Sequence, residues 1–116
     1  MARIQHPLAL HADAAETWRF ISDNVLRSGV VDQSVKDLCF RYISDPDAID
    51  IVTFDGRERA ALEWANAIIR DAGAAGDDLW ERLHSFFSEK ELVDLGCAIG
   101  FELGRQHFLR TFGVAP

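Results

Sequence analysis

Three residues carry side chains whose types and spacing could do chemistry. Asp37 and Arg41 lie four positions apart in the segment QSVKDLCFRYI, and His107 belongs to the last apolar stretch of the chain. A carboxyl group and an imidazole can exchange protons with a bound molecule, and a guanidinium can bind an anionic group. If the chain is an enzyme, we expect Asp37 and His107 to be catalytic and Arg41 to bind the substrate.

Each of these residues also has a purely structural interpretation. The spacing of Asp37 and Arg41 is that of an ion pair on an exposed helix face, which stabilises a helix by about 0.3–0.5 kcal/mol. His107 falls between Leu103 and Gly100 on a helical wheel, inside an apolar arc, where a buried histidine would donate to a carbonyl. The three residues should meet at one cleft in an enzyme and be scattered over solvent or core in a non-catalytic module.

No other pattern points to a cofactor or a metal. The sequence has no metal-ligand spacing, phosphate-binding glycine loop or Ser-His-Asp arrangement. Cys39 and Cys97 stand in apolar contexts far apart and form no C-x-x-C motif, so we expect both to be reduced and buried.

Composition predicts one globular domain over residues 1–116. Of the 116 residues, 48% are hydrophobic and 27% are charged, which is typical of a chain that folds. The net charge of -7 argues against nucleic acid and anionic membrane surfaces as partners. No apolar run approaches the roughly 20 residues that span a bilayer, and the first ten residues lack a signal-peptide layout, so we expect a cytoplasmic protein.

Helical spacing of apolar residues predicts an all-α bundle of about five helices. The first lies in HADAAETWRFISDNVLRSG, starts with an Asp13–Glu16 capping box and ends at Gly29, and the second covers QSVKDLCFRYI. The third follows an Asp55–Glu58 capping box and ends near DAGAAG. Asp77 caps the fourth, whose apolar stripe is Leu79, Leu83 and Phe86. A Ser88–Glu91 capping box begins the fifth. Residues 45–54 are predicted to be a loop that tucks apolar side chains against the bundle.

Glycines at positions 96, 100 and 104 mark the last helix, although each costs a helix about 1 kcal/mol relative to alanine. Two apolar stripes flank these glycines on a helical wheel, and the charged residues occupy the remaining sector. We therefore predict a single rod over residues 89–110 that protein encloses on most sides, with a neighbouring segment against its glycines. It would be the central helix of the bundle or the interface helix of an oligomer.

Two blocks of the sequence resemble the carboxymuconolactone decarboxylase and alkyl-hydroperoxidase-D-like family. VVDQSVKDLCFRYIS is similar to that family's prlrELvilrva helix, and the stretch from FDGRERAALEWANAIIRD to LVDLGCAIGFELGRQHFLRTFGV is similar to its second half. Together the blocks cover roughly residues 31–114. The resemblance implies a hydroperoxidase-D-like helical bundle that assembles into a homo-oligomer, a trimer or a hexamer.

The chain departs from that family at the redox motif. The peroxidase branch has a C-x-x-C and a histidine between the two blocks, whereas residues 49–56 here read IDIVTFDG. Asp37 stands where the family has a glutamate. We therefore expect a decarboxylase-like protein without redox cysteines that does acid/base chemistry on a small carboxylate or lactone. The alternative is a non-catalytic oligomeric scaffold or interaction module that has lost the active-site helix, and whether the chain is an enzyme stays open.

Overall fold

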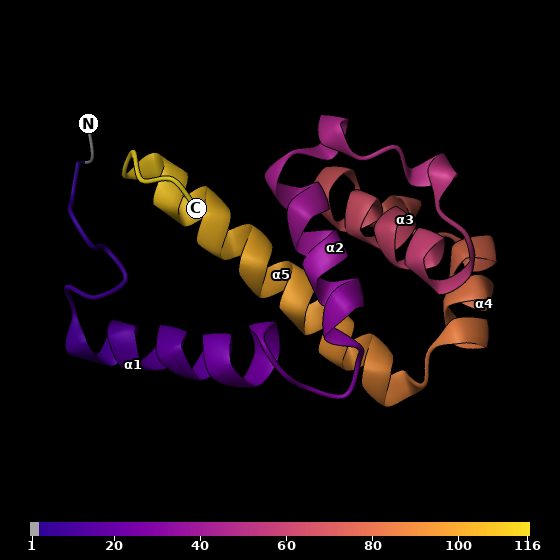
Figure 1. The fold of residues 1–116 in the computed structure, drawn as a ribbon, viewed down its shortest axis with the longest axis horizontal. Coiled ribbons are helices and arrows are strands. Elements are labelled where there is room, and N and C mark those ends of the chain that lie inside the picture. Colours follow the sequence, from indigo (N-terminus) through magenta and orange to yellow (C-terminus); the bar gives the residue numbers. More distant parts are fainter. Residues whose placement is uncertain (1–2) are drawn as a thin grey trace.

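The helices that the spacing of apolar residues predicts are present in the structure. The computed structural model describes residues 3–116, and within that range the chain forms helices and no β-strand (Figure 1). The α-helices are α1 (Ala12–Ile21), α2 (Gln33–Ser44), α3 (Gly56–Arg70), α4 (Asp77–Phe86) and α5 (Glu89–Thr111). The prediction of an all-α domain with five helical segments is confirmed.

The main core lies between α2, α3, α4 and the first half of α5. Each helix contributes apolar residues from one face, and the most deeply buried of these are Cys39, Leu62, Leu83, Leu95 and Ile99. The predicted loop contains two short 3-10 turns, Pro46–Ala48 and Ile51–Thr53, and its Ile49, Ile51 and Phe54 pack against this core. In α4 the predicted Phe86 is exposed, because the helix ends there and the following Phe87 turns inward instead.

Helix α1 extends away from this core (Figure 1). It continues into a π-helical turn, Ser22–Leu26, whose Leu26 packs with Ile21 and with Ala98 of α5 in a second, smaller cluster. The radius of gyration is 15.0 Å, whereas a compact chain of this length has about 13 Å. The molecule is therefore elongated, with extents of 42 × 28 × 24 Å.

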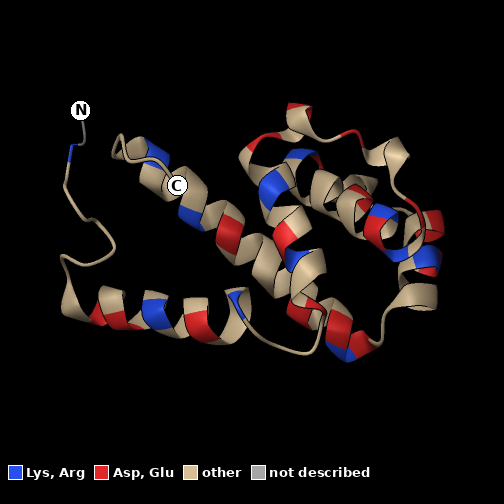
Figure 2. Cartoon of the chain, in the orientation of Figure 1, with Lys and Arg blue, Asp and Glu red and all other residues tan. Residues whose placement is uncertain are grey.

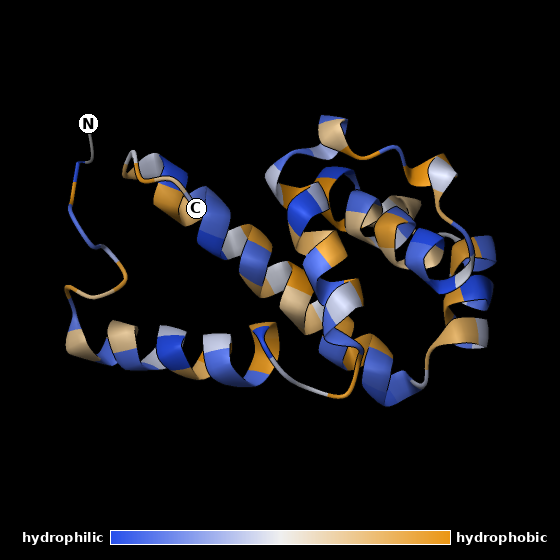
Figure 3. Ribbon diagram, in the orientation of Figure 1, coloured by the Kyte–Doolittle hydropathy of each residue, from blue (hydrophilic) through white to orange (hydrophobic). Residues whose placement is uncertain are grey.

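Helix α5 is the single rod that the sequence predicts. Ser88 accepts from the amide of Glu91 at 3.2 Å, and the Glu91 carboxylate accepts from the amide of Ser88 at 3.0 Å, which completes the predicted capping box. The helix continues without a break through Gly100 to Thr111. Hydrophobic residues follow its whole length, including the end that projects beyond α2 (Figure 3).

The other three predicted caps are wrong in detail. His11, and not Asp13, is the N-cap of α1, and its Nδ1 accepts from the amide of Ala14 at 3.4 Å. Asp55 holds the N-cap position of α3 but makes no capping hydrogen bond, and Asp77 lies inside the first turn of α4. An acidic residue inside the first turn also stabilises a helix, through the macrodipole. The sequence near a helix start therefore does not show whether the acidic residue is the N-cap or lies one or two positions later.

The prediction that protein encloses α5 on most sides is wrong for the single chain. Val93 is 67% exposed, Phe101 42% and Phe108 39%. Only one face of the helix is buried, and it carries Leu92, Leu95, Ala98, Ile99, Glu102, Gln106 and Leu109.

The two cysteines differ in their surroundings. Cys39 is fully buried, as predicted, and burial raises the pKa of its thiol to about 12. Cys97 is exposed on α5, so the prediction of burial is wrong for it. Within residues 3–116 the structure contains no group of side chains that could hold a metal ion, and none of the helices is long and apolar enough to cross a membrane.

Candidate functional site

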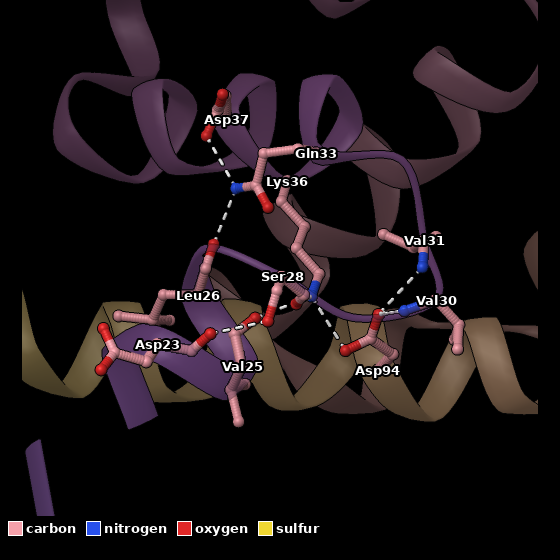
Figure 4. Close-up of polar contacts among 10 residues, drawn as sticks. All are labelled: Asp23, Val25, Leu26, Ser28, Val30, Val31, Gln33, Lys36, Asp37 and Asp94. Carbon is pink, nitrogen blue, oxygen red and sulfur yellow. Dashed lines mark hydrogen bonds and ion pairs between the residues drawn. The ribbon is translucent and has the colours of Figure 1, made fainter. Parts of the chain in front are cut away.

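A buried ion pair between Lys36 of α2 and Asp94 of α5 holds the polar centre of the structure together (Figure 4). The Lys36 side chain is fully buried, and its Nζ lies 2.9 Å from Asp94 Oδ1. Nζ also donates to the carbonyl oxygens of Val25 at 2.7 Å and Ser28 at 2.6 Å. All three protons of the ammonium are therefore used, which a buried charge requires. We call this arrangement the Lys36–Asp94 latch.

The second oxygen of Asp94 fastens the connection between the π-helical turn and α2. Oδ2 accepts from the amides of Val30 at 2.8 Å and Val31 at 2.9 Å. Burial alone would raise the pKa of Asp94, but the hydrogen bonds from Lys36 and from these two amides outweigh it and lower the pKa below its ordinary value. Every charged group of the latch is paired, so the latch is a structural device and offers no free acid or base.

A polar pocket of about 260 Å³ opens beside the latch, between α1, the π-helical turn, α2 and α5. The residues of its wall that bear on chemistry are Trp18, Arg27, Gln33, Asp37, Glu102 and Arg105. Gln33 Nε2 donates to the carbonyl of Leu26 at 2.7 Å and to Asp37 Oδ1 at 3.1 Å (Figure 4). Its Oε1 is buried and has no hydrogen-bond partner among the described residues.

Glu102 carries the buried charge of the polar pocket, and it is fully paired. Arg105 binds it through two parallel hydrogen bonds, Nε to Oε1 at 2.6 Å and Nη2 to Oε2 at 2.9 Å. Gln106 Nε2 donates to Oε2 at 2.9 Å. The hydrogen bond to Glu102 raises the pKa of Arg105 above its usual value. Three hydrogen bonds, two of them from a charged partner, therefore already occupy the Glu102 carboxylate.

The structure separates the three residues that the sequence proposes for chemistry. Asp37 lines the polar pocket. Arg41 is exposed one turn further along α2, outside the residues of that pocket, and no ion pair joins it to Asp37 in the described part of the chain. His107 is exposed on α5, so its predicted place in a buried arc is wrong. The catalytic roles of Asp37 and His107 and the binding role of Arg41 stay predictions.

Sequence reasoning missed the residues that the polar pocket and the latch use. Glu102 and Arg105 are three positions apart on a helix, which is the spacing of a pair, but the wheel places them in a sector that reads as solvated. Lys36 is a lysine on an amphipathic helix, and such residues are almost always exposed. Lys36 can be buried because its charge is paired with Asp94, which lies on another helix.

The exposed face of α5 is the second notable surface. We define the α5 stripe as Val93, Cys97, Gly100, Phe101, Gly104 and Phe108, all of which are exposed. Gly100 and Gly104 have open space where a Cβ would be. The stripe contains no charged residue, and the α5 ribbon carries none between Asp94 and Glu102 (Figure 2). Soluble helices normally place charge on such a face.

An apolar groove of about 530 Å³ runs beside the first half of α5. We call it the Trp groove, and its walls include Trp64, Trp80, His84, Val93, Gly96 and Cys97. Trp64 and Trp80 meet edge to face with ring centroids 5.5 Å apart. A Cβ at Gly96 would lie 2.9 Å from Trp64, so this glycine allows close packing, as the sequence predicts. The same prediction is wrong for Gly100 and Gly104 in the single chain, because no segment packs against either of them.

No protein-family model, no curated protein and no solved structure matches this chain. Residues 3–116 form an all-helical fold whose surfaces include a polar pocket, an apolar groove and an uncharged exposed helix face. Membership of the carboxymuconolactone decarboxylase and hydroperoxidase-D-like family stays a prediction from the sequence.

Proposed function

We propose that this protein is a non-catalytic helical module that self-associates through the α5 stripe into a homo-oligomer. The observation that carries the proposal is the stripe itself, which is apolar or small over four turns, uncharged and exposed in the single chain. Contiguous apolar surface of this kind marks a contact site on a soluble protein.

The composition of the stripe favours another helix as its occupant. Burying apolar surface contributes about 25 cal/mol per Å², and Val93, Phe101 and Phe108 supply most of that surface. The open space at Gly100 and Gly104 lets a second backbone approach closely, which increases the number of atomic contacts. A helix with the same stripe, from a second copy of the chain, supplies both the large and the small residues.

The dispersal of the candidate catalytic residues also supports a module over an enzyme. Arg41 and His107 lie outside the polar pocket that contains Asp37, and the Glu102 carboxylate is occupied by Arg105. General acid/base catalysis needs its groups within hydrogen-bond reach of one bound molecule.

Light scattering coupled to size exclusion tests the proposal. The wild-type chain should elute with a mass that is a multiple of 13.0 kDa, and Phe101→Glu should elute as a monomer with unchanged helicity. The control is Val52→Glu, because Val52 is also an exposed hydrophobic residue, at 65% against 42% for Phe101, but lies in the 3-10 turn Ile51–Thr53, away from α5. A wild-type chain that stays monomeric at high micromolar concentration refutes self-association.

The second candidate is acid/base chemistry at the polar pocket on a small carboxylate or lactone. The observation that favours it is the unpartnered Gln33 Oε1 beside Asp37, which leaves an acceptor for a bound donor group. Arg27, on the same wall, would take the place that the sequence gives to Arg41. The indole resonance of Trp18 should shift when a hydroxy acid or a lactone is added, and the absence of any shift at millimolar ligand rules this candidate out.

A further inference from the structure

We propose that two copies of α5 cross antiparallel about a two-fold axis near Gly100 and Phe101, so that the Phe108–Phe112 pair of each copy enters the Trp groove of the other. This inference rests on the proposed self-association and adds its geometry. It assigns the occupant of the Trp groove, for which the single chain supplies no side chain.

The first step is the pattern of large and small residues along the α5 stripe. In an antiparallel pair centred between Gly100 and Phe101, each residue faces the one equally far on the other side of the centre. Gly100 then faces Phe101, Cys97 faces Gly104, and Val93 faces Phe108. Each phenyl ring meets a glycine or a short side chain, and both copies make the same contacts, as a two-fold interface requires.

A parallel arrangement lacks this complementarity. It would place Phe101 against Phe101 and leave Gly100 opposite Gly100, so that bulky contacts would hold the glycine notches apart.

Charge also favours the antiparallel arrangement. The first half of α5 is net acidic, with Glu89, Glu91 and Asp94 against Lys90, and its second half is net basic, with Arg105 and Arg110 against Glu102. Antiparallel helices bring the acidic beginning of one copy beside the basic end of the other, whereas parallel helices would place like charges together. The macrodipoles of the two helices are likewise opposed, which is the favourable orientation for side-by-side helices.

The second step is the position of the Trp groove along α5. Glu89 and Val93 both line the groove. The same pairing places Phe112 of the second copy opposite Glu89 and Phe108 opposite Val93. Phe108 and Phe112 already stack edge to face with centroids 4.8 Å apart, so they form a preassembled aromatic pair. Trp64 and Trp80 offer aromatic walls to that pair.

This geometry makes Cys97 a reporter of the interface. Its thiol is exposed in the single chain and would be covered by Gly104 of the second copy. Cys39 is buried with a raised thiol pKa, so it stays unreactive and does not confuse the measurement.

The experiment measures the rate at which Cys97 of the full chain reacts with a maleimide, across a range of protein concentrations that light scattering shows to span monomer and oligomer. The rate should fall about tenfold or more as the oligomer forms, and the fluorescence of Trp64 and Trp80 should change over the same range. Phe108→Ala should raise the dissociation constant about tenfold, as expected for a central aromatic contact, while Val52→Ala should leave it unchanged.

A second variant separates the interface from the fold. Gly104→Leu meets open space in the single chain and improves helix propensity, so its melting temperature should not fall. It should nevertheless weaken association about tenfold, because the leucine would occupy the space of Cys97 in the second copy. An oligomer in which Cys97 stays fully reactive, or in which Phe108→Ala and Gly104→Leu have no effect, overturns this geometry and leaves self-association standing. A chain that is monomeric throughout overturns both.

Discussion

Replacing Asp94 by asparagine tests the Lys36–Asp94 latch directly. The change keeps the shape of the side chain but removes the charge that faces the fully buried Lys36 ammonium. The asparagine can face Nζ with its nitrogen, which is a donor as Nζ is, or with its oxygen, which is a weaker, neutral acceptor. Removing one partner of a buried ion pair costs about 3–5 kcal/mol, because the other charge stays buried without compensation.

This cost translates into a large shift of the melting temperature. Unfolding entropy is about 2.1 cal/mol/K per residue, so for a chain of 116 residues 1 kcal/mol corresponds to about 4 °C. Asp94→Asn should therefore melt about 12–20 °C below the wild type in differential scanning calorimetry. The control is Asp78→Asn, which removes an exposed i,i+4 pair with Arg82 and should shift the melting temperature by only a few degrees.

Equal shifts for Asp94→Asn and Asp78→Asn would refute the reasoning, because the buried ammonium would then tolerate the loss of its counter-charge. The double variant Lys36→Met, Asp94→Asn gives a further check. It should lose less stability than the sum of the two single variants, since neither charge remains unpaired.

Three further predictions follow from the same geometry. Because the pKa of Asp94 is lowered in the folded state, its contribution to stability is complete above the unfolded pKa of about 3.9 and is lost as the pH falls through the folded pKa. In urea titrations the free energies of unfolding of the wild type and Asp94→Asn should therefore converge as the pH falls through that range. Gly29→Ala should cost about 2 kcal/mol or more by chemical denaturation, because Gly29 has φ +135° and a Cβ there would overlap the Asp94 carboxylate. Gly100→Ala should raise stability by about 1 kcal/mol at monomer concentrations, whereas Gly96→Ala should lower it against Trp64, and equal melting temperatures for the two would contradict this.

The helices could be predicted because local signals determine them. Apolar residues at helical spacing and the Ser88–Glu91 box place α5 correctly, since both features act within a few residues of one another. The side of α5 that is buried could not be predicted in this way. The wheel shows apolar residues on both sides, and only the positions of α2 and α3 decide that Leu95 is buried and Phe101 is exposed.

The polar residues of the structure were the hardest to predict. Asp37 was identified, and it does line the polar pocket, but its partner is Gln33 and not Arg41. Lys36 and Asp94 are far apart in the sequence, so no local pattern relates them. Their pairing depends on how α2 packs against α5, which no local sequence pattern specifies.

The contact between Arg3 and the end of α5 has a practical consequence. The amide of Arg3 donates to the carbonyl of Phe112 at 2.6 Å, and Arg3 Nη1 donates to the carbonyl of Thr111 at 3.1 Å. A short flexible linker could therefore join Arg3 to the residues after Phe112 without moving a helix, and the exposed turn Ala72–Ala74 offers a place to open the chain. In such a circular permutant, α4 and α5 would be synthesised before α1, so the order in which the core and its projecting helix emerge during translation could be reversed at will.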